Sequence, residues 1–292
     1  MRLNEIDDTQ NITELLTTHF DITGKVSIIN GFVNITGDCK LLLSRKIKTL
    51  PVKFGSVSGD FRCHNNRLTS LQGAPTSVSG NFDCADNKLT SLQGAPISVG
   101  GDFDCNSNKL TSLQGAPTSV GGYFDCSSNQ LTSLQGAPTS IGGDFSCSFN
   151  QLTSLEGSPI SVGGSFGCSS NQLTSLHGSP SSVVGNFGCD SNLLTTLEGA
   201  PSSVGGRFGC NINQLTSLQG APTSVGGTFV CPYNKNLELL KLLFIKNLKS
   251  IRIFRQDDVE GILNKYIGKG PGGALACAAE LIKAGFRENA RR

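Results

Sequence analysis

Apolar and polar positions follow one pattern that recurs every 21 residues along most of this 292-residue chain. No copy of the pattern holds enough apolar residues to bury its own face, so neighbouring copies must stack to form a continuous core. The period predicts a repeat solenoid, which presents a binding surface more readily than a catalytic pocket. Cysteine marks the period at Cys63, Cys84, Cys105, Cys126, Cys147, Cys168, Cys189, Cys210 and Cys231.

Within one copy, residues 120–126 alternate between apolar or small residues and residues that tolerate solvent. This period of two is typical of a strand with one buried face. The predicted inward positions are Val120, Gly122, Phe124 and Cys126. After Cys126 the alternation stops, so the chain is expected to turn a corner there.

An asparagine follows each of these cysteines by three residues, at the predicted corner. Its amide can both donate to and accept from backbone groups that a turn leaves unpaired. The repetition favours a hydrogen-bonded asparagine ladder along the solenoid, and a solvated turn residue is the alternative. The ladder would comprise Asn66, Asn87, Asn108, Asn129, Asn150, Asn171, Asn192, Asn213 and Asn234.

The repeated cysteines are expected to stay reduced. Equivalent side chains on neighbouring coils lie about 4.8 Å apart and point the same way, whereas a disulfide needs converging Cβ atoms at roughly 3.8 Å. No pair has the Cys-x-x-Cys spacing of a metal site. The pattern therefore predicts a row of free buried thiols, with no metal and no cofactor.

The segment from Phe124 to Leu134, Phe-x-Cys-x-x-Asn-x-Leu-x-x-Leu, resembles the core of a leucine-rich repeat. Phe and Cys stand where that family usually has Leu, and the Leu-Thr-Ser-Leu and Pro elements are similar to the short bacterial-type repeats of secreted effectors. The resemblance covers residues 47–236. It implies 21-residue coils with one parallel sheet and a scaffold for protein–protein interaction.

The whole layout also resembles uncharacterised repeat proteins of tailed bacteriophages. The resemblance rests on Leu50-Pro51-Val52-Lys53-Phe54, on the Leu-Thr-Ser-Leu-Gln-Gly-Ala-Pro copies, and on the tail segments 262–266 and 280–282. It implies a virus-encoded or horizontally acquired protein, and it implies no particular activity.

The ends of the chain depart from the repeat and are expected to cover its open strand edges. Residues 1–46 are interpreted as an N-terminal cap, with a helix over 8–19, strands within 25–35 and a degenerate first coil at Cys39. Residues 47–236 form the repeat solenoid. Residues 237–292 are interpreted as a mostly helical C-terminal cap. The predicted fold class is a mainly β, leucine-rich-repeat-like solenoid with these two caps.

Charged residues at 1–8 and the lack of a long apolar run predict neither a secretory leader nor a membrane span. We therefore expect a cytoplasmic protein, in the host cytoplasm if it is virus-encoded.

Outward positions of the predicted strands are rich in acid in the first half of the repeat and carry four large side chains. Coil stacking would place them in rows that can bind a basic protein surface or divalent cations. Solubility, protection against edge pairing and local packing are the alternatives. The candidate partner-binding residues are Asp83, Asp102, Asp104, Tyr123, Asp125, Asp144, Phe149, Ile212 and Tyr233.

The C-terminal segment is basic, since residues 237–292 hold 11 Lys and Arg against 6 Asp and Glu. Association with nucleic acid through Lys265, Lys269, Lys283 and Arg287 is therefore an alternative function, as a viral regulator. Solvated helix faces explain the same charges.

Catalytic chemistry finds little support in the sequence. His19, His64 and His177 lie far apart, and no nucleophile, base and orienting group come together. The prediction is a non-enzymatic scaffold that binds a protein partner. A virion or assembly component is a weaker alternative, and the pattern leaves the oligomeric state open.

Overall fold

A computed structural model describes the backbone of residues 3–42 and 47–290. The chain divides into two compact units, Met1–Ser146 and Cys147–Arg292, and each is described by itself. The sequence-based boundaries after residues 46 and 236 stay predictions.

The first unit begins with a helix and a small group of strands. Helix α1 (Leu3–His19) begins five residues before the predicted start and leads into β1 (Phe20–Ile22). The expected strands of residues 25–35 are β2 (Lys25–Ile29) and β3 (Phe32–Thr36), which pair antiparallel. Strand β4 (Cys39–Leu41) pairs in parallel with the first regular coil, with Cys39 opposite Phe61. This register confirms that Cys39 takes the phenylalanine position of a degenerate coil.

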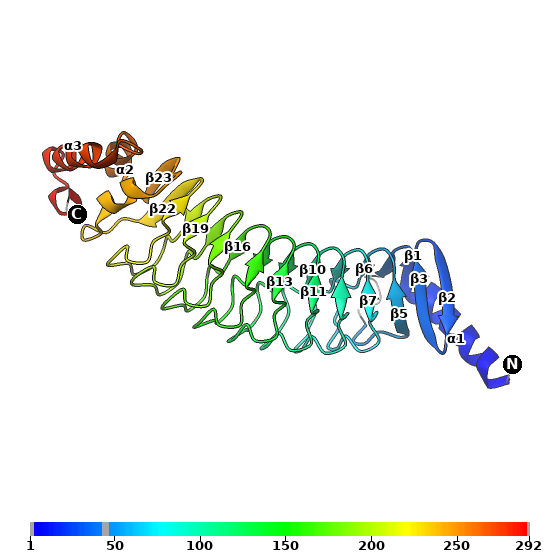
Figure 1. Cartoon of the computed structure of the whole chain (residues 1–292). Coiled ribbons are helices and arrows are strands. Elements are labelled where there is room, and N and C mark those ends of the chain that lie inside the picture. The colour runs from blue at the N-terminus through cyan, green and yellow to red at the C-terminus, as the bar shows by residue number, and fades with distance from the viewer. Residues whose placement is uncertain (1–2, 43–46, 291–292) are drawn as a thin grey trace. The chain divides into compact units, whose positions relative to one another are not determined.

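Each regular coil of the first unit contributes two short strands (Figure 1). One set forms a parallel sheet with β4 and the other a parallel sheet with β3. The first set is β6 (Phe61–Arg62), β8 (Phe82–Asp83), β10 (Phe103–Asp104), β12 (Phe124–Asp125) and β14 (Phe145–Ser146). The second set is β5 (Lys53–Val57), β7 (Ser77–Val78), β9 (Ser98–Val99), β11 (Ser119–Val120) and β13 (Ser140–Ile141).

The single strand predicted over residues 120–126 is therefore two strands with a bend between them. Gly122 lies in the bend, where an added Cβ would sit 2.0 Å from the Asp102 carboxylate. A side chain at this position would collide with the preceding coil, and this explains why the bend uses glycine. Val120, Phe124 and Cys126 are buried as predicted, whereas Gly122 is half-buried.

Phenylalanine rings form the centre of the core. In the first unit the rings of Phe61, Phe82, Phe103 and Phe124 stack with centroids 5.5, 5.4 and 5.1 Å apart. All four side chains are fully buried, and each ring packs on the ring of the preceding coil. Contacts between adjacent coils therefore form this part of the core.

The cysteines line the same core and are all free and buried, as predicted. The Cys105 thiol donates to the Asp125 carbonyl of the next coil over 3.3 Å, and the Cys126 thiol donates to the Ser146 carbonyl over 3.2 Å. Burial raises the pKa of the Cys105 thiol well above its ordinary value, so the neutral thiol persists at physiological pH.

The asparagine ladder is confirmed within each unit. Asn108 accepts the Leu89 N–H through Oδ1 over 3.0 Å, and its Nδ2 donates to the carbonyls of Cys84 and Cys105 over 3.0 and 3.2 Å. Asn87 and Asn129 repeat these bonds one coil away on either side. Asn234 departs from the pattern, because its Oδ1 accepts the N–H of Asn236.

The second unit continues the 21-residue coils and ends in a mostly helical segment. Its strands are β15 (Ser161–Val162), β16 (Phe166–Gly167), β17 (Ser182–Val183), β18 (Phe187–Gly188), β19 (Ser203–Val204), β20 (Phe208–Gly209), β21 (Ser224–Val225) and β22 (Thr228–Pro232). The last segment comprises the 3₁₀ helix η2 (Leu239–Phe244), β23 (Ser250–Phe254), α2 (Asp257–Asn264), α3 (Gly270–Lys283) and the 3₁₀ turn η3 (Arg287–Ala290).

Strand β23 pairs in parallel with β22, so the sheet of the second unit runs on into the C-terminal segment. Helix α2 packs on β23, and the Asn264 amide both donates to the Ile251 carbonyl and accepts the Ile251 N–H, each over 2.8 Å. The segment predicted to be mostly helical begins with η2, a 3₁₀ helix of six residues. Each unit thus has the predicted mainly β, leucine-rich-repeat-like solenoid architecture.

Candidate partner-binding surface

Three carboxylates form a row on the outward face of the first unit. Asp83, Asp104 and Asp125 are the second residues of β8, β10 and β12, and the parallel pairing places them directly opposite one another. Neighbouring strands lie about 4.8 Å apart, so each acid stands beside the next. We call these three residues the strand row.

Each carboxylate of the strand row is held by its own turn. The Asp104 Oδ1 accepts the Asn106 N–H over 3.0 Å and the Asn106 side-chain amide over 2.7 Å. Asp83 and Asp125 accept the equivalent N–H groups over 3.1 and 2.8 Å. These bonds fix the positions of the acids because few side-chain rotations satisfy them.

The central acid of the row is poised to bind a proton or a cation. Burial raises the pKa of Asp104 to about 6, and repulsion from Asp125 and Asp83 adds to the effect. The hydrogen bonds from Asn106 work in the opposite direction, because they favour the charged form. A positive charge that approaches Asp104 would remove part of this electrostatic cost.

A second row lies just before the same strands and joins the coils through side chains. Asp60, Asn81 and Asp102 each accept the N–H of the equivalent residue in the next coil, over 2.7, 2.8 and 2.8 Å. Asp102 therefore stabilises the stack as well as adding charge. The predicted Asp144 occupies the same repeat position and is exposed.

Tyr123 connects the two rows. Its N–H donates to Asp102, and its hydroxyl donates to the Asp104 Oδ2 over 3.4 Å. Burial, followed by the charges of Asp104 and Asp102, raises the pKa of the Tyr123 hydroxyl, which stays protonated and can donate. The ring remains 37% exposed beside the acids.

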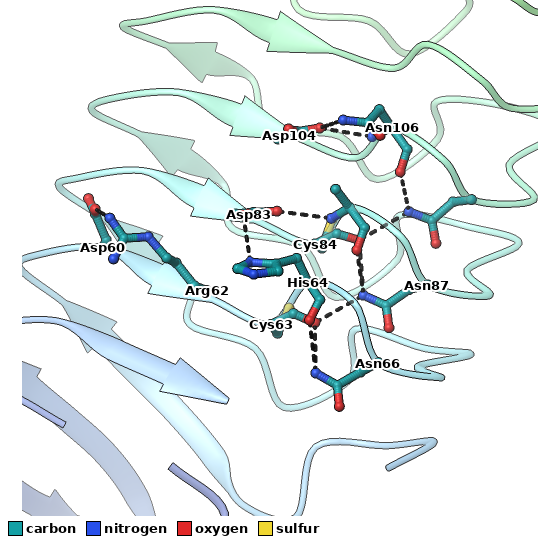
Figure 2. A network of polar contacts seen from close by, with 12 residues as sticks. Asp60, Arg62, Cys63, His64, Asn66, Asp83, Cys84, Asn87, Asp104 and Asn106 are labelled. Carbon is teal, nitrogen blue, oxygen red and sulfur yellow. Dashed lines mark hydrogen bonds and ion pairs between the residues drawn. The ribbon is translucent and has the colours of Figure 1, made fainter. Parts of the chain in front are cut away.

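Arg62 and His64, which the sequence analysis did not connect with this face, lie at one end of these rows (Figure 2). The Arg62 guanidinium pairs with Asp60, and the His64 Nδ1 lies 2.7 Å from the Asp83 Oδ2. Arg62 pairs with Asp83 in the sheet register, so aligning the chain in columns of 21 would have revealed it. The Arg62 guanidinium therefore offsets the charge of Asp60 at this end of the rows.

In the second unit, the predicted residues Phe149 and Ile212 occupy the corner that follows the cysteine. Their φ angles are 56° and 52°, and their side chains are 62% and 63% exposed. The equivalent corners of Ser170 and Ser191 carry the same positive φ on small polar residues. The left-handed conformation costs a bulky or β-branched residue about 1–2 kcal/mol, so these two side chains are strained as well as exposed.

Tyr233 has a structural contact in the second unit. Its hydroxyl donates to the Asn289 Oδ1 over 3.3 Å, and the Asn289 amide donates in turn to the carbonyls of Asn234 and Lys235 over 3.1 and 3.2 Å. Tyr233 therefore fastens η3 to the last coil, although 36% of it remains exposed.

The basic residues of the alternative function are partly engaged within the second unit. The Lys265 ammonium pairs with Glu280, and the Lys269 ammonium lies 4.9 Å from the centroid of the Tyr266 ring. Lys283 and Arg287 lie on exposed positions at the ends of α3 and in η3. The Glu280 carboxylate therefore offsets the charge of Lys265.

Metal-binding clusters are absent from residues 3–42 and 47–290. In that part of the chain, no three His, Cys, Asp or Glu side chains lie close enough to hold a metal ion. None of the described helices is both long and apolar enough to cross a membrane.

Comparison with known proteins finds a similarity between this chain and YopM from Yersinia enterocolitica WA-314, with a TM-score of 0.43 and 19% sequence identity. The similarity covers 68% of this chain and 52% of YopM, so the chain spans about half of that protein. No protein-family profile and no curated protein matches the sequence.

Proposed function

We propose that this protein is a non-enzymatic scaffold whose first unit binds a protein partner that presents Lys or Arg. The observation that supports this proposal is the in-register strand row, in which Asp104 is flanked by Asp83 and Asp125. Adjacent like charges are destabilising in the free protein, and a cationic side chain between them relieves the repulsion.

Tyr123 adds a second reason to place the partner on this face. A half-exposed tyrosine beside fixed acids combines an apolar ring with a hydroxyl, and such residues are frequent anchors in interfaces. An arginine from the partner can stack on the ring while its guanidinium reaches Asp104.

Two neutralising substitutions test the acidic surface. Asp104→Asn and Asp125→Asn remove the charge and keep the oxygen that accepts the turn N–H. At Asp104 the new amide NH2 also replaces the oxygen that accepts the Tyr123 hydroxyl, and the tyrosine oxygen can accept from it instead. With a partner recovered from lysate of the source cells, calorimetry should show about a tenfold loss of affinity for each variant and a weaker dependence on salt. Glu156→Gln, on an exposed turn of the second unit, is the matched control. Unchanged affinity in both Asp variants would reject this face.

Phe149 and Ile212 define a separate proposed contact on the second unit. We infer that they anchor a partner, because equivalent corners such as Ser170 and Ser191 carry small polar residues in the same backbone conformation, whereas these two place a large apolar side chain in solvent. Phe149→Ser and Ile212→Ser copy the residue found at Ser170 and Ser191. Each change should weaken partner binding and alter the free energy of unfolding by less than about 1 kcal/mol, because serine brings the same Cβ to the left-handed corner. A variant that stays folded and binds as before would show that the exposed side chain has no role in binding.

From the sequence we further propose a viral origin and a cytoplasmic location, and, as a weaker alternative function, a role in virion assembly. The nucleic-acid alternative predicts binding that weakens steeply with salt, and a salt-independent complex would exclude it.

A further inference from the structure

One edge of the first unit is an unpaired strand. Strand β2 is the last strand of its sheet, and among the described residues its backbone pairs only with β3. Asn30 and Gly31 join the two strands with φ angles of 52° and 75°, the conformation of a two-residue type I′ turn. Ile29 and Phe32 flank this turn and are consequently a hydrogen-bonded pair.

The pairing alternates along β2 from this point. Ile29, Ser27 and Lys25 direct their backbone groups towards β3, whereas Val26 and Ile28 direct theirs towards the open edge. All five residues of β2 pair without a bulge. The edge therefore offers two complete sets of N–H and C=O groups to another strand.

The side chains at this edge are apolar and accessible. Val26 is 43% exposed and Ile29 is 57% exposed. Val26 and Ile28 also line a groove of about 710 Å³ with Leu16 of α1 and Phe20 of β1. Exposed strand edges in other proteins are usually blocked by proline, a bulge or several charges, and β2 has a single Lys25 at one end.

We propose that β2 pairs antiparallel with β2 of a second copy, around a two-fold axis at Ser27. In this register Val26 of one copy lies opposite Ile28 of the other, so the outward backbone groups of both copies meet. The lysines fall at opposite ends of the ladder, roughly 14 Å apart, and avoid each other. This surface lies in the N-terminal segment and is independent of the acidic rows.

A second copy supplies complementary chemistry to this edge, because Val26 meets Ile28 in two apolar pairs and the two Lys25 charges stay apart. An axis at Val26 would leave Ile28 beyond the end of the paired segment, and an axis at Ile28 would do the same to Lys25. With the axis at Ser27, all five residues pair. The Val26 and Ile28 side chains of both copies then lie on the same face of the joined sheet. They extend the apolar groove across the two-fold axis, so both copies use the same surface, as in an isologous interface.

A cysteine cross-link tests this register directly. The residue on the axis belongs to a non-hydrogen-bonded pair, whose Cα atoms lie about 4.5 Å apart, within disulfide range. Ser27→Cys should therefore form a covalent dimer under mild oxidation, whereas Lys25→Cys should not. The native cysteines are buried and do not compete. No cross-link at position 27, or equal cross-linking at both positions, would overturn the proposal.

Sedimentation velocity of the full chain provides the second measurement. The unmodified protein should dimerise, and Ile28→Lys should raise the dissociation constant by about a hundredfold, because each copy then brings a charge to the apolar edge. Ile160→Lys, at a site that is 77% exposed in the second unit, should leave it unchanged. A protein that stays monomeric at all concentrations would refute the two-fold dimer. Pairing of this edge only with a different protein would refute it as well. Ile28→Lys should still bind the basic partner, so failure of one proposal is distinguishable from failure of the other.

Discussion

Replacing Asp104 with Asn should stabilise the protein at neutral and alkaline pH. The pKa of Asp104 is about 6 in the folded protein, against an ordinary value of 3.8. The folded state therefore binds more protons than the unfolded state between these values, and stability falls as pH rises through the interval. Asn carries no charge, so this loss should be absent from the variant.

The size of the effect follows from the shift of about two pKa units. Each unit corresponds to about 1.4 kcal/mol, so complete ionisation of Asp104 would destabilise the fold by about 3 kcal/mol. The side chain is partly exposed, and screening by water reduces this figure to about 1–2 kcal/mol. The Asn106 bonds survive the change, because the amide oxygen of Asn can accept both of them.

Urea unfolding followed by circular dichroism at pH 8 and at pH 4 measures this difference. At pH 8 the Asp104→Asn midpoint should rise by roughly half a molar, and at pH 4 the two proteins should nearly coincide. Glu156→Gln, on an exposed turn, should show no such pH-dependent gain. A variant that is no more stable at pH 8, or one whose gain persists unchanged at pH 4, would refute the reasoning.

Two other predictions concern the core. Asn108→Ala removes the acceptor of the Leu89 N–H and the donor to the Cys84 carbonyl, and it should lower the free energy of unfolding by about 3 kcal/mol, whereas Gln114→Ala on the surface should change it by less than about 0.5 kcal/mol. Because burial raises the pKa of these thiols, for Cys277 to about 11, a thiol reagent at pH 8 should label native protein very slowly and all eleven cysteines in urea. Rapid labelling of the native protein would contradict the burial of the thiols.

The 21-residue period was sufficient to predict the architecture, because the same few positions face inward in every coil. The asparagine ladder was predictable for the same reason, because an asparagine follows each cysteine at the same spacing. Asn87, Asn108 and Asn129 form equivalent hydrogen bonds. The bend at Gly122 was not predicted, since alternation of apolar and polar residues looks the same in one strand and in two short ones. The early start of α1 at Leu3 was missed because residues 3–7 lack a clear apolar stripe.

The candidate surface was less predictable than the core. The sequence placed Asp104 and Asp125 in one row, which the register shows, but it gave no sign that Asp102 also holds the next coil through the Tyr123 N–H. Side-chain bonds between coils depend on rotamers, which a residue pattern does not encode. The positive φ of Phe149 was equally hidden, because Phe reads as an apolar residue at any backbone conformation.

The in-register stacking of identical coils has a consequence for the history of the gene. Phe82 meets Phe103 in the same way as Phe103 meets Phe124, so loss of the 21 residues between two equivalent positions would bring together surfaces that already fit. Unequal recombination between the repeated codons can therefore lengthen or shorten the array by whole coils while the hydrophobic interior stays continuous. Such events would add or delete an entire rung of outward residues at once, which makes the composition of the exposed face far easier to change than the fold beneath it.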